Sequence, residues 1–327
     1  MKKILIIQSA SIGDVILATP VVEKLHTTFP EAKIDLLVKK GNETLFTGHP
    51  FLNEVLIWDK RSRSLMNFDK LLHRIRKTRY DLIVNIQRFF LTGLMTACSG
   101  AKTKIGFDKN PLSYFFTLRV PHVISDSIHE VHRNLSLIAS FAGPGTVRPK
   151  LYPTAEDSKR VESYRTPMFY TISPASLWFT KQYPAKQWIS FIRMIPPGRE
   201  IYLLGSRTDH ALCEQIRIQS GSVYCKNLAG ELTFLESAAL MSKAKMNFTN
   251  DSAPMHLASA VNAPVTAIFC STVPGFGFGP LSDDSATIQT NEQLLCRPCG
   301  LHGIENCPEK HFRCALSLPT EKLRARC

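Results

Sequence analysis

The sequence lacks several features that define common protein classes. No apolar run approaches the roughly 18 residues that a membrane-spanning helix needs, so we do not expect an integral membrane protein. The chain contains no short-period repeat and no low-complexity tract, which excludes repeat arrays and biased linkers. The motif G-x-G-x-x-G is also absent, and a nicotinamide-dependent dehydrogenase is therefore disfavoured.

A further absence concerns metal binding at a nucleotide. No two aspartates are separated by a single residue, so the chain has no Asp-x-Asp element of the kind that holds a divalent metal on a nucleotide diphosphate. If a nucleotide leaves a substrate here, a lysine, backbone N–H groups and helix termini must stabilise its charge. We therefore expect that catalysis requires no metal or other cofactor.

Length and composition narrow the remaining classes. The 327 residues suffice for two domains, each with its own core, and the hydrophobic content of 44% is that of a soluble globular protein. Gln8 ends the apolar stretch at the N-terminus, and Asp14 would interrupt any longer one. We interpret that stretch as a buried strand and not as a signal peptide, and we expect a cytoplasmic protein.

The formal net charge is +13, and basic residues are concentrated between positions 59 and 79. Such a segment attracts the phosphates of a nucleotide, a nucleic acid or an anionic lipid surface. A solvated helix face is the simpler interpretation. We expect no nucleic-acid partner, because few aromatic residues interleave the basic ones and no nucleic-acid-binding motif is present.

Apolar runs alternate with helical patterns, which is typical of βαβ units around parallel sheets. The predicted strands lie near residues 4–8, 34–38, 54–58, 82–86, 168–172, 201–204, 245–249 and 265–269. The predicted helices lie near residues 15–27, 65–77, 185–194, 209–219, 233–241 and 253–261. Proline and glycine between 141 and 167 mark a linker. We predict an α/β protein with two Rossmann-like domains, residues 1–150 and 151–327, facing across a cleft.

A turn with one carboxylate follows the first predicted strand. The stretch Ser9-Ala10-Ser11-Ile12-Gly13-Asp14 contains small residues that let the backbone turn sharply and a ligand approach. Asp14 stands near the start of a helix, and its spacing favours a capping carboxylate that the helix dipole stabilises. The alternative is a general base, which needs a place in the cleft and a pKa suited to accepting a hydroxyl proton.

A second strand-to-helix turn, Thr249-Asn250-Asp251-Ser252-Ala253-Pro254-Met255-His256, has a proline suited to the first helical turn. Its N–H groups would form an anion site for nucleotide phosphates, with Ser252 and His256 as further donors. A plain N-cap with a packed histidine fits the segment equally well.

Two more segments follow strands of the same predicted sheet. Gly275, Gly277 and Gly279 form a glycine-rich loop after the strand near 265–269. Lys181 follows the strand near 168–172, where it either neutralises phosphate charge or is an ordinary surface lysine. Two loops that suit phosphate on one sheet edge are stronger evidence than one.

Four cysteines cluster near the end of the chain: Cys296, Cys299, Cys307 and Cys314. The first pair has the spacing of zinc ligands, whereas the second pair does not. A structural zinc site and free or reversibly oxidised thiols both stay open, since disulfides are unusual in the cytosol. Either role would be structural.

Together these segments resemble the bacterial heptosyltransferases of glycosyltransferase family nine, over essentially the whole chain. The most specific match is Asp251-Ser252-Ala253-Pro254-Met255-His256-Leu257-Ala258, and Ser11-Ile12-Gly13-Asp14-Val15-Ile16-Leu17-Ala18-Thr19-Pro20 also matches. The resemblance implies a GT-B fold and an inverting, metal-independent transfer. The sugar would pass from ADP-heptose to an acceptor in the inner core of lipopolysaccharide.

The resemblance also implies residue roles. Asp14 would be the catalytic base on the acceptor side, beside Ser11 and Gly13. The donor would be held by Lys181, Asp251, Ser252, Ala253 and His256. The basic segment, with Arg61 and Arg63, is expected to face the anionic glycolipid acceptor or the inner membrane surface, which would make the protein peripheral.

The chain departs from the family pattern at several donor positions. Many relatives have Thr-Gly where this chain has Ser252-Ala253. Some relatives have two threonines before the lysine, and there this chain has one hydroxyl residue, Ser176. Asp209 aligns loosely with an acidic residue near the donor ribose. Two alternatives stay open: a transferase or epimerase for another nucleotide sugar, and a non-catalytic protein that binds a nucleotide sugar.

Overall fold

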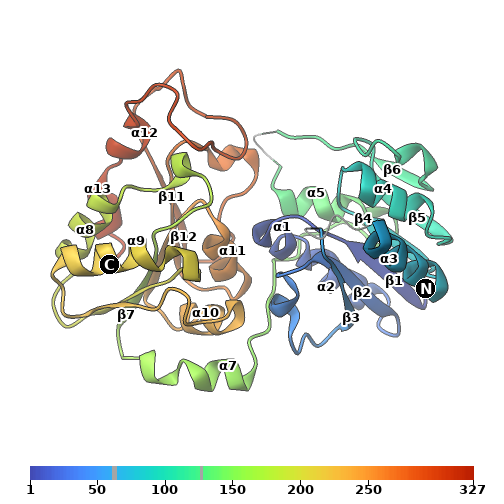
Figure 1. Ribbon diagram of the computed structural model, residues 1–327, viewed down its shortest axis with the longest axis horizontal. Coiled ribbons are helices and arrows are strands. Elements are labelled where there is room, and N and C mark those ends of the chain that lie inside the picture. Colours follow the sequence, from blue (N-terminus) through green and yellow to red (C-terminus); the bar gives the residue numbers. More distant parts are fainter. Residues whose placement is uncertain (61–64, 126–127) are drawn as a thin grey trace. The chain divides into compact units, whose positions relative to one another are not determined.

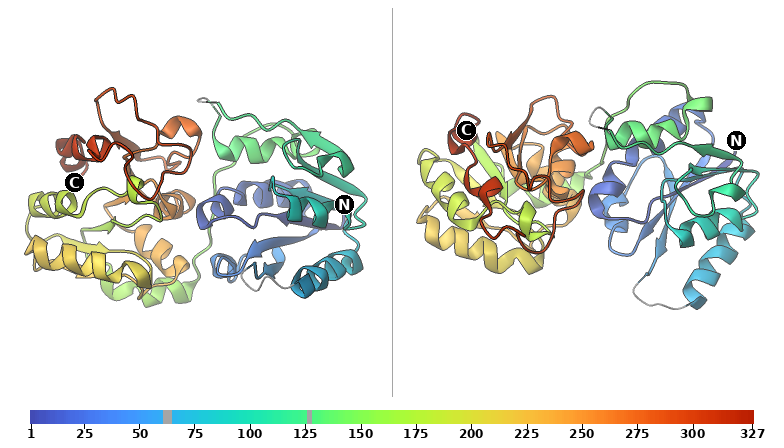
Figure 2. Two further views of the ribbon diagram at one scale, coloured as in Figure 1. Left: turned by 45° about the horizontal axis from the view of Figure 1, so that its top comes forward. Right: turned by 90° about the horizontal axis from the view of Figure 1, so that it is seen from above.

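The computed structural model describes residues 1–327 except 61–64 and 126–127. The chain divides into two compact units, Met1–Tyr152 and Pro153–Cys327 (Figure 1). Each unit contains one six-stranded sheet, and every strand pairing in the described residues is parallel. In Figure 2 each sheet lies between helices. The predicted α/β class, with the two Rossmann-like units of a GT-B fold, is confirmed, whereas the cleft and the roles of the two domains stay predictions.

Unit 1 has the strand order β3-β2-β1-β4-β5-β6. Its strands are β1 (Lys3–Ile7), β2 (Lys33–Lys39), β3 (Leu52–Trp58), β4 (Leu82–Asn85), β5 (Thr103–Phe107) and β6 (Leu118–Val120). Its helices and 3-10 turns are α1 (Ile12–Ile16), α2 (Thr19–Thr28), η1 (Glu43–Phe46), α3 (Leu65–Thr78), α4 (Phe90–Ala97), η2 (Ser113–Phe115), α5 (Glu130–Ser136) and α6 (Ala139–Ala142). The central strands are apolar on both faces, as a sheet covered twice by helices requires.

Unit 2 has the strand order β12-β11-β10-β7-β8-β9. Its strands are β7 (Phe169–Ser173), β8 (Glu200–Leu203), β9 (Cys225–Asn227), β10 (Met246–Asn250), β11 (Val265–Phe269) and β12 (Ser285–Gln289). Its helices and turns are α7 (Ala155–Arg160), η3 (Glu162–Tyr164), η4 (Phe179–Lys181), α8 (Ala185–Met194), η5 (Arg207–Asp209), α9 (His210–Ser220), α10 (Phe234–Met241), α11 (Ala253–Ala260), η6 (Pro274–Phe276), α12 (Arg313–Leu316) and α13 (Thr320–Arg324). Trp188 and Phe191 of α8 pack into its core with Phe248 of β10.

The helix predicted for residues 15–27 is wrong in one respect, because the structure has two helices there, α1 and α2. Pro20 is the cause. A proline lacks the N–H that would continue the helix from α1, and its ring collides with the carbonyl four residues earlier. The second helix, α2, therefore begins at Thr19. The Thr19 hydroxyl donates to the Ile16 carbonyl at 2.8 Å. Among the described residues, no helix combines the length and apolarity needed to cross a membrane.

Candidate functional site

Each sheet has a topological switch point, where the chain leaves two central neighbouring strands in opposite directions. The switch lies between β1 and β4 in unit 1 and between β7 and β10 in unit 2. Open α/β sheets bind ligands at the carboxyl ends of such strands. The turns predicted to carry function follow β1, β7, β10 and β11, so they emerge at these carboxyl edges.

Asp14 is the third residue of α1 and forms a capping box with Ser11. Its Oδ2 accepts hydrogen bonds from the Ser11 backbone N–H at 3.2 Å and from the Ser11 hydroxyl. Asp14 is half-buried. The capping role that the spacing favours is therefore present. The carboxylate also lies at the carboxyl edge of the sheet, and the role of a general base stays a prediction.

The loop between β1 and α1 is tied to its neighbours by buried amides. The Gln8 side chain is 2% exposed, and its Oε1 accepts from Gln87, so the loops after β1 and β4 are joined across the switch point. Asn42, which is 1% exposed, donates to the Ala10 carbonyl at 3.1 Å. Sequence reasoning missed these three amides, because the partners in each contact are far apart in the chain: Gln8 and Gln87 by 79 residues, and Asn42 and Ala10 by 32.

Arg61 and Arg63, the predicted acceptor-side cations, lie outside the described residues. Their neighbour Lys60 is described, and its Nζ donates to the Ser9 carbonyl at 2.7 Å. A cation of the basic segment therefore reaches the loop that leads to Asp14. Gly13 is the second residue of α1 and lies within the same turn.

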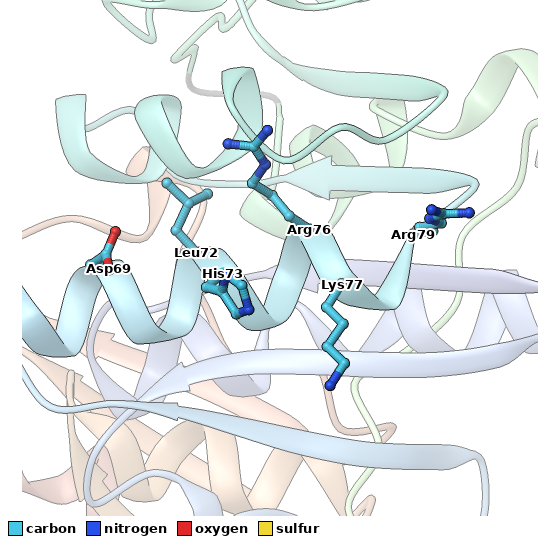
Figure 3. A pocket seen from close by; sticks show the side chains of 6 residues that line it. All are labelled: Asp69, Leu72, His73, Arg76, Lys77 and Arg79. Atoms are coloured by element: carbon cyan, nitrogen blue, oxygen red, sulfur yellow. The ribbon is translucent and has the colours of Figure 1, made fainter.

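Residues 65–78 of the basic segment form α3. A hollow of about 770 Å3 lies along this helix (Figure 3), lined by Asp69, Leu72, His73, Arg76, Lys77 and Arg79. The Lys3 ammonium at the start of β1 donates to the Thr78 carbonyl at 3.1 Å. The cations at the end of α3 therefore lie at the amino edge of the sheet, opposite to the edge that carries Asp14.

In unit 2, Asn250 joins the two sides of the switch point. Its side chain is completely buried at the end of β10. Its Oδ1 accepts from the Tyr183 N–H at 3.0 Å, and its Nδ2 donates to the Pro174 carbonyl at 2.8 Å. The loop after β7 is thus attached to β10 at both of its ends.

Lys181 and Asp251 form a buried ion pair at this edge. The distance from Lys181 Nζ to Asp251 Oδ2 is 2.7 Å, and the two side chains are 15% and 7% exposed. The same oxygen accepts from the Thr272 hydroxyl at 2.6 Å. Loops after β7, β10 and β11 therefore meet at one carboxylate. A lysine ammonium has three donors, and this pair uses one of them.

The C-terminal segment braces the backbone that carries this lysine. The Thr180 N–H donates to the Ile304 carbonyl at 3.1 Å, and the Ile304 N–H donates back to the Thr180 hydroxyl at 2.9 Å. Gly303 has φ +75°, and a Cβ added there would lie 2.8 Å from Lys181 Cγ. Thr180, which is 1% exposed, and Gly303 were missed by sequence reasoning.

The predicted anion site at α11 has the expected local form. Ser252 is the N-cap residue with an extended backbone, Ala253 begins the helix, and Pro254 lies in the first turn. His256, the fourth residue of α11, is 5% exposed. The helix N-terminus therefore follows directly after the carboxylate that holds Lys181, and it presents backbone N–H groups at the same sheet edge.

Two further predicted donor residues lie on the neighbouring loops after β7 and β8. The Ser176 carbonyl accepts from Gln182 Nε2 at 2.6 Å. Asp209 forms a capping box with Ser206, because its Oδ2 accepts from the Ser206 N–H at 2.8 Å and from its hydroxyl at 2.6 Å. Asp209 thus has the same local geometry as Asp14.

The glycine-rich loop follows β11, as predicted. Gly275 lies in η6, and Gly277 ends that turn with φ +88°, a left-handed conformation that favours glycine. Gly279 follows two residues later. The loop begins two residues after Thr272 and thus belongs to the same carboxyl edge as the ion pair.

The predicted zinc cluster is not assembled in the structure. Cys296 Sγ lies 4.0 Å from His311 Nε2. Burial raises the pKa of the Cys314 thiol to about 11, and the charges of Cys299 and Cys307 also act to raise this pKa. In the described part of the chain, no group of three or more His, Cys, Asp or Glu side chains is placed to hold a metal ion. A structural zinc site and free or reversibly oxidised thiols therefore both stay open.

The chain is similar in sequence and in fold to known proteins. The family model described as glycosyltransferase family 9 (heptosyltransferase) matches residues 68–303. Lipopolysaccharide heptosyltransferase 3 of Escherichia coli is 27% identical over 80% of this chain and 81% of its own length. Lipopolysaccharide heptosyltransferase 2 of E. coli strain K12 is 26% identical over 88% of both chains. The solved structure of E. coli ADP-heptose lps heptosyltransferase II shares the fold, with a TM-score of 0.75 at 24% identity, covering 100% of this chain and 98% of its own.

Proposed function

Because the chain belongs to glycosyltransferase family 9, the heptosyltransferases, we propose that it transfers a heptose from ADP-heptose to the inner core of lipopolysaccharide. Family membership makes the protein a glycosyltransferase. The donor and acceptor are proposed from the names of its relatives, two of which are lipopolysaccharide heptosyltransferases and one of which is named for ADP-heptose.

The observation that carries the donor assignment is the Lys181–Asp251 pair beside the N-terminus of α11. An ammonium that is 15% exposed and held by a carboxylate presents its remaining donors in a fixed direction. Backbone N–H groups of the helix N-terminus are adjacent in the chain and attract anions. This combination suits a nucleotide diphosphate, whose charge grows as the sugar leaves, and it stabilises that charge without a metal.

The chemical step uses the carboxylate of unit 1. Asp14 accepts the proton of an acceptor hydroxyl while that oxygen attacks the anomeric carbon of the donor. The bond between the anomeric carbon and the diphosphate oxygen breaks, ADP leaves with the electron pair, and the anomeric configuration inverts. Ser11 orients Asp14 through the two hydrogen bonds to Oδ2.

The remaining donor residues have supporting roles in this proposal. Ser252, Ala253 and His256 line the α11 terminus, and the glycines at 275, 277 and 279 form the loop after β11. Asp251 acts on the donor through Lys181. Asp209 and Ser176 lie on adjacent loops and would contact the ribose and the diphosphate. Arg61 and Arg63, with Lys60, would meet the anionic acceptor, and the protein would work as a peripheral protein at the inner membrane surface.

The proposal is tested by a donor screen with the purified protein. ADP-heptose and several UDP- and GDP-sugars are each offered with a purified lipopolysaccharide core acceptor, and nucleotide release and product mass are measured. We expect ADP release and a product heavier by one heptose. Turnover of a UDP- or GDP-sugar alone would indicate a different nucleotide-sugar enzyme, and nucleotide binding without turnover would indicate a non-catalytic binding protein.

A further inference from the structure

Five large apolar side chains are exposed on two adjacent segments of unit 1, the start of α4 and the 3-10 turn η2. We call them the aromatic patch: Phe89, Phe90, Leu91, Tyr114 and Phe115. Tyr114 is 85% exposed, Phe115 is 65% exposed and Phe89 is 64% exposed. Isolated exposed apolar residues are common on protein surfaces, but a contiguous group marks a binding surface.

The two segments are held together by a buried residue, so the grouping is built into the fold. Asn110 is 1% exposed, and its Nδ2 donates to the carbonyls of Gln87 at 3.0 Å and of Phe89 at 3.2 Å. A Cβ at Gly93 of α4 would collide with Asn110 Oδ1, so glycine is required for this approach. The helix α4, which carries Phe90 and Leu91, contacts η2, which carries Tyr114 and Phe115.

The surroundings of the patch are cationic. Three basic residues lie on the segments that carry or adjoin the patch, Arg88 after β4, Lys109 after β5 and Arg119 in β6, against one acidic residue, Asp108. The Arg119 guanidinium lies over the Tyr114 ring, 5.0 Å from its centre. The Asp108 carboxylate accepts from the His122 N–H at 2.9 Å, so the acidic group is engaged by the backbone. Exposed aromatic rings with cations beside them are complementary to a surface that carries anionic groups on the outside and apolar groups beneath them.

The position of the patch matches the site of unit 1. Arg88 and Phe89 follow β4, and Lys109 follows β5, so these residues emerge at the carboxyl edge of the sheet, and the contact between α4 and η2 keeps Tyr114 and Phe115 beside them. The loop after β4 is joined to the loop that leads to Asp14 by the contact between Gln87 and Gln8. The cations at the end of α3, in contrast, lie at the amino edge.

We propose that the aromatic patch docks unit 1 onto the surface of an anionic lipid bilayer. Aromatic rings enter the interfacial region, and Arg88, Lys109 and Arg119 contact lipid phosphates. The inference rests on the proposed function only in that the acceptor of that reaction is a membrane glycolipid. It places the membrane contact in the loops after β4 and β5, and not on α3.

The proposal is tested by co-sedimentation of the full-length protein with vesicles of phosphatidylcholine, with and without phosphatidylglycerol. The variants are F89S/F90S and Y114S/F115S. I218S/V223S in unit 2 is the matched control, because it removes two equally exposed apolar side chains elsewhere. We expect the unaltered protein to bind the anionic vesicles. Each patch variant should bind at least about tenfold more weakly, and the control variant should bind like the unaltered protein.

A second measurement separates membrane docking from catalysis and folding. The patch variants should transfer sugar to a delipidated, water-soluble acceptor at the unaltered rate, and should lose activity only toward acceptor embedded in vesicles. Unaltered thermal melting would confirm that they fold. The proposal is overturned if the patch variants still bind vesicles, if R76Q/K77Q on α3 loses binding in their place, or if the unaltered protein binds no anionic vesicle. If the protein binds vesicles through the patch but turns over no ADP-heptose, only the proposed function fails.

Discussion

Lys181 and Asp251 form an ion pair of 2.7 Å that joins the loops after β7 and β10 across the switch point of unit 2. Both side chains are largely buried, and the Thr272 hydroxyl donates to the same carboxylate oxygen at 2.6 Å. A buried charge that keeps its partner is tolerated, whereas a charge that loses its partner destabilises the fold by about 3–5 kcal/mol. The pair therefore has to be altered on both sides when its role in binding is measured.

The first prediction concerns recognition of the diphosphate. In the double variant K181M/D251N, no unpaired buried charge remains, and we expect ADP affinity to fall by about ten- to a hundredfold, the loss of one charge-assisted hydrogen bond. AMP affinity should change little, because the lysine is assigned to the diphosphate. Isothermal titration of both nucleotides checks this, and an equal loss for ADP and AMP would contradict the assignment.

The second prediction concerns the brace behind Lys181. Replacing Gly303 by Ala puts a Cβ 2.8 Å from Lys181 Cγ, and we expect the KM for the donor to rise about tenfold. G300A is the matched control, because Gly300 has a similar φ of +71° but no atom within 4 Å of an added Cβ. The same KM in both variants would show that backbone strain, and not the lysine, is affected.

The Thr180 hydroxyl gives an independent check of the same brace. It accepts from the Ile304 N–H at 2.9 Å and from the Ser271 hydroxyl at 3.0 Å. T180V leaves these buried donors without an acceptor and should raise the donor KM and cost about 1–3 kcal/mol of stability. T180S keeps the hydroxyl and should restore the donor KM. If T180S is as impaired as T180V, the threonine methyl and not the hydroxyl is what matters.

The third prediction concerns metal ions in catalysis. Because charge on the leaving diphosphate is assigned to Lys181 and helix N–H groups, transfer by the purified protein should proceed at an unchanged rate in EDTA. Strict dependence on added Mg²⁺ in a steady-state assay would contradict this. The measurement is made with the donor in excess, so that weak metal chelation by the nucleotide does not alter the donor concentration.

The cysteine cluster allows a separate measurement. If a structural zinc is present, mass spectrometry of the purified protein should find about one metal ion per chain, and C299S should lose it together with thermal stability. C98S, an exposed cysteine of unit 1, is the control. No bound metal in the unaltered protein would leave the four residues as ordinary thiols.

The sequence predicts the fold and the turns at strand ends well, because these depend on local pattern. Four short strands were missed: β5, β6, β9 and β12. They are interrupted by polar residues or lie at sheet edges where half of the side chains meet solvent, so they lack the continuous apolar run of a central strand. The motif around Asp251 was recognisable because its residues are consecutive.

The partners of the site residues were not predictable in the same way. Thr180 and Ile304 are 124 residues apart, and Gln8 and Gln87 are 79 apart. No local pattern connects such pairs, since their contact depends on the strand order. Local spacing also fails to separate a capping role from a catalytic one. Asp14 and Asp209 share one capping geometry, although only Asp14 is proposed to act as a base.

The most direct measurement is the transfer rate of D14N, compared with that of D157N. Asp157 forms the same kind of capping box with Thr154 in α7, so both variants lose a negative charge at a helix N-terminus, which is worth about 0.3–1 kcal/mol. If Asp14 is the base, D14N should transfer heptose about 10²–10⁴-fold more slowly while binding ADP normally, and D157N should be fully active. Equal activity of D14N and D157N would show that Asp14 only caps its helix.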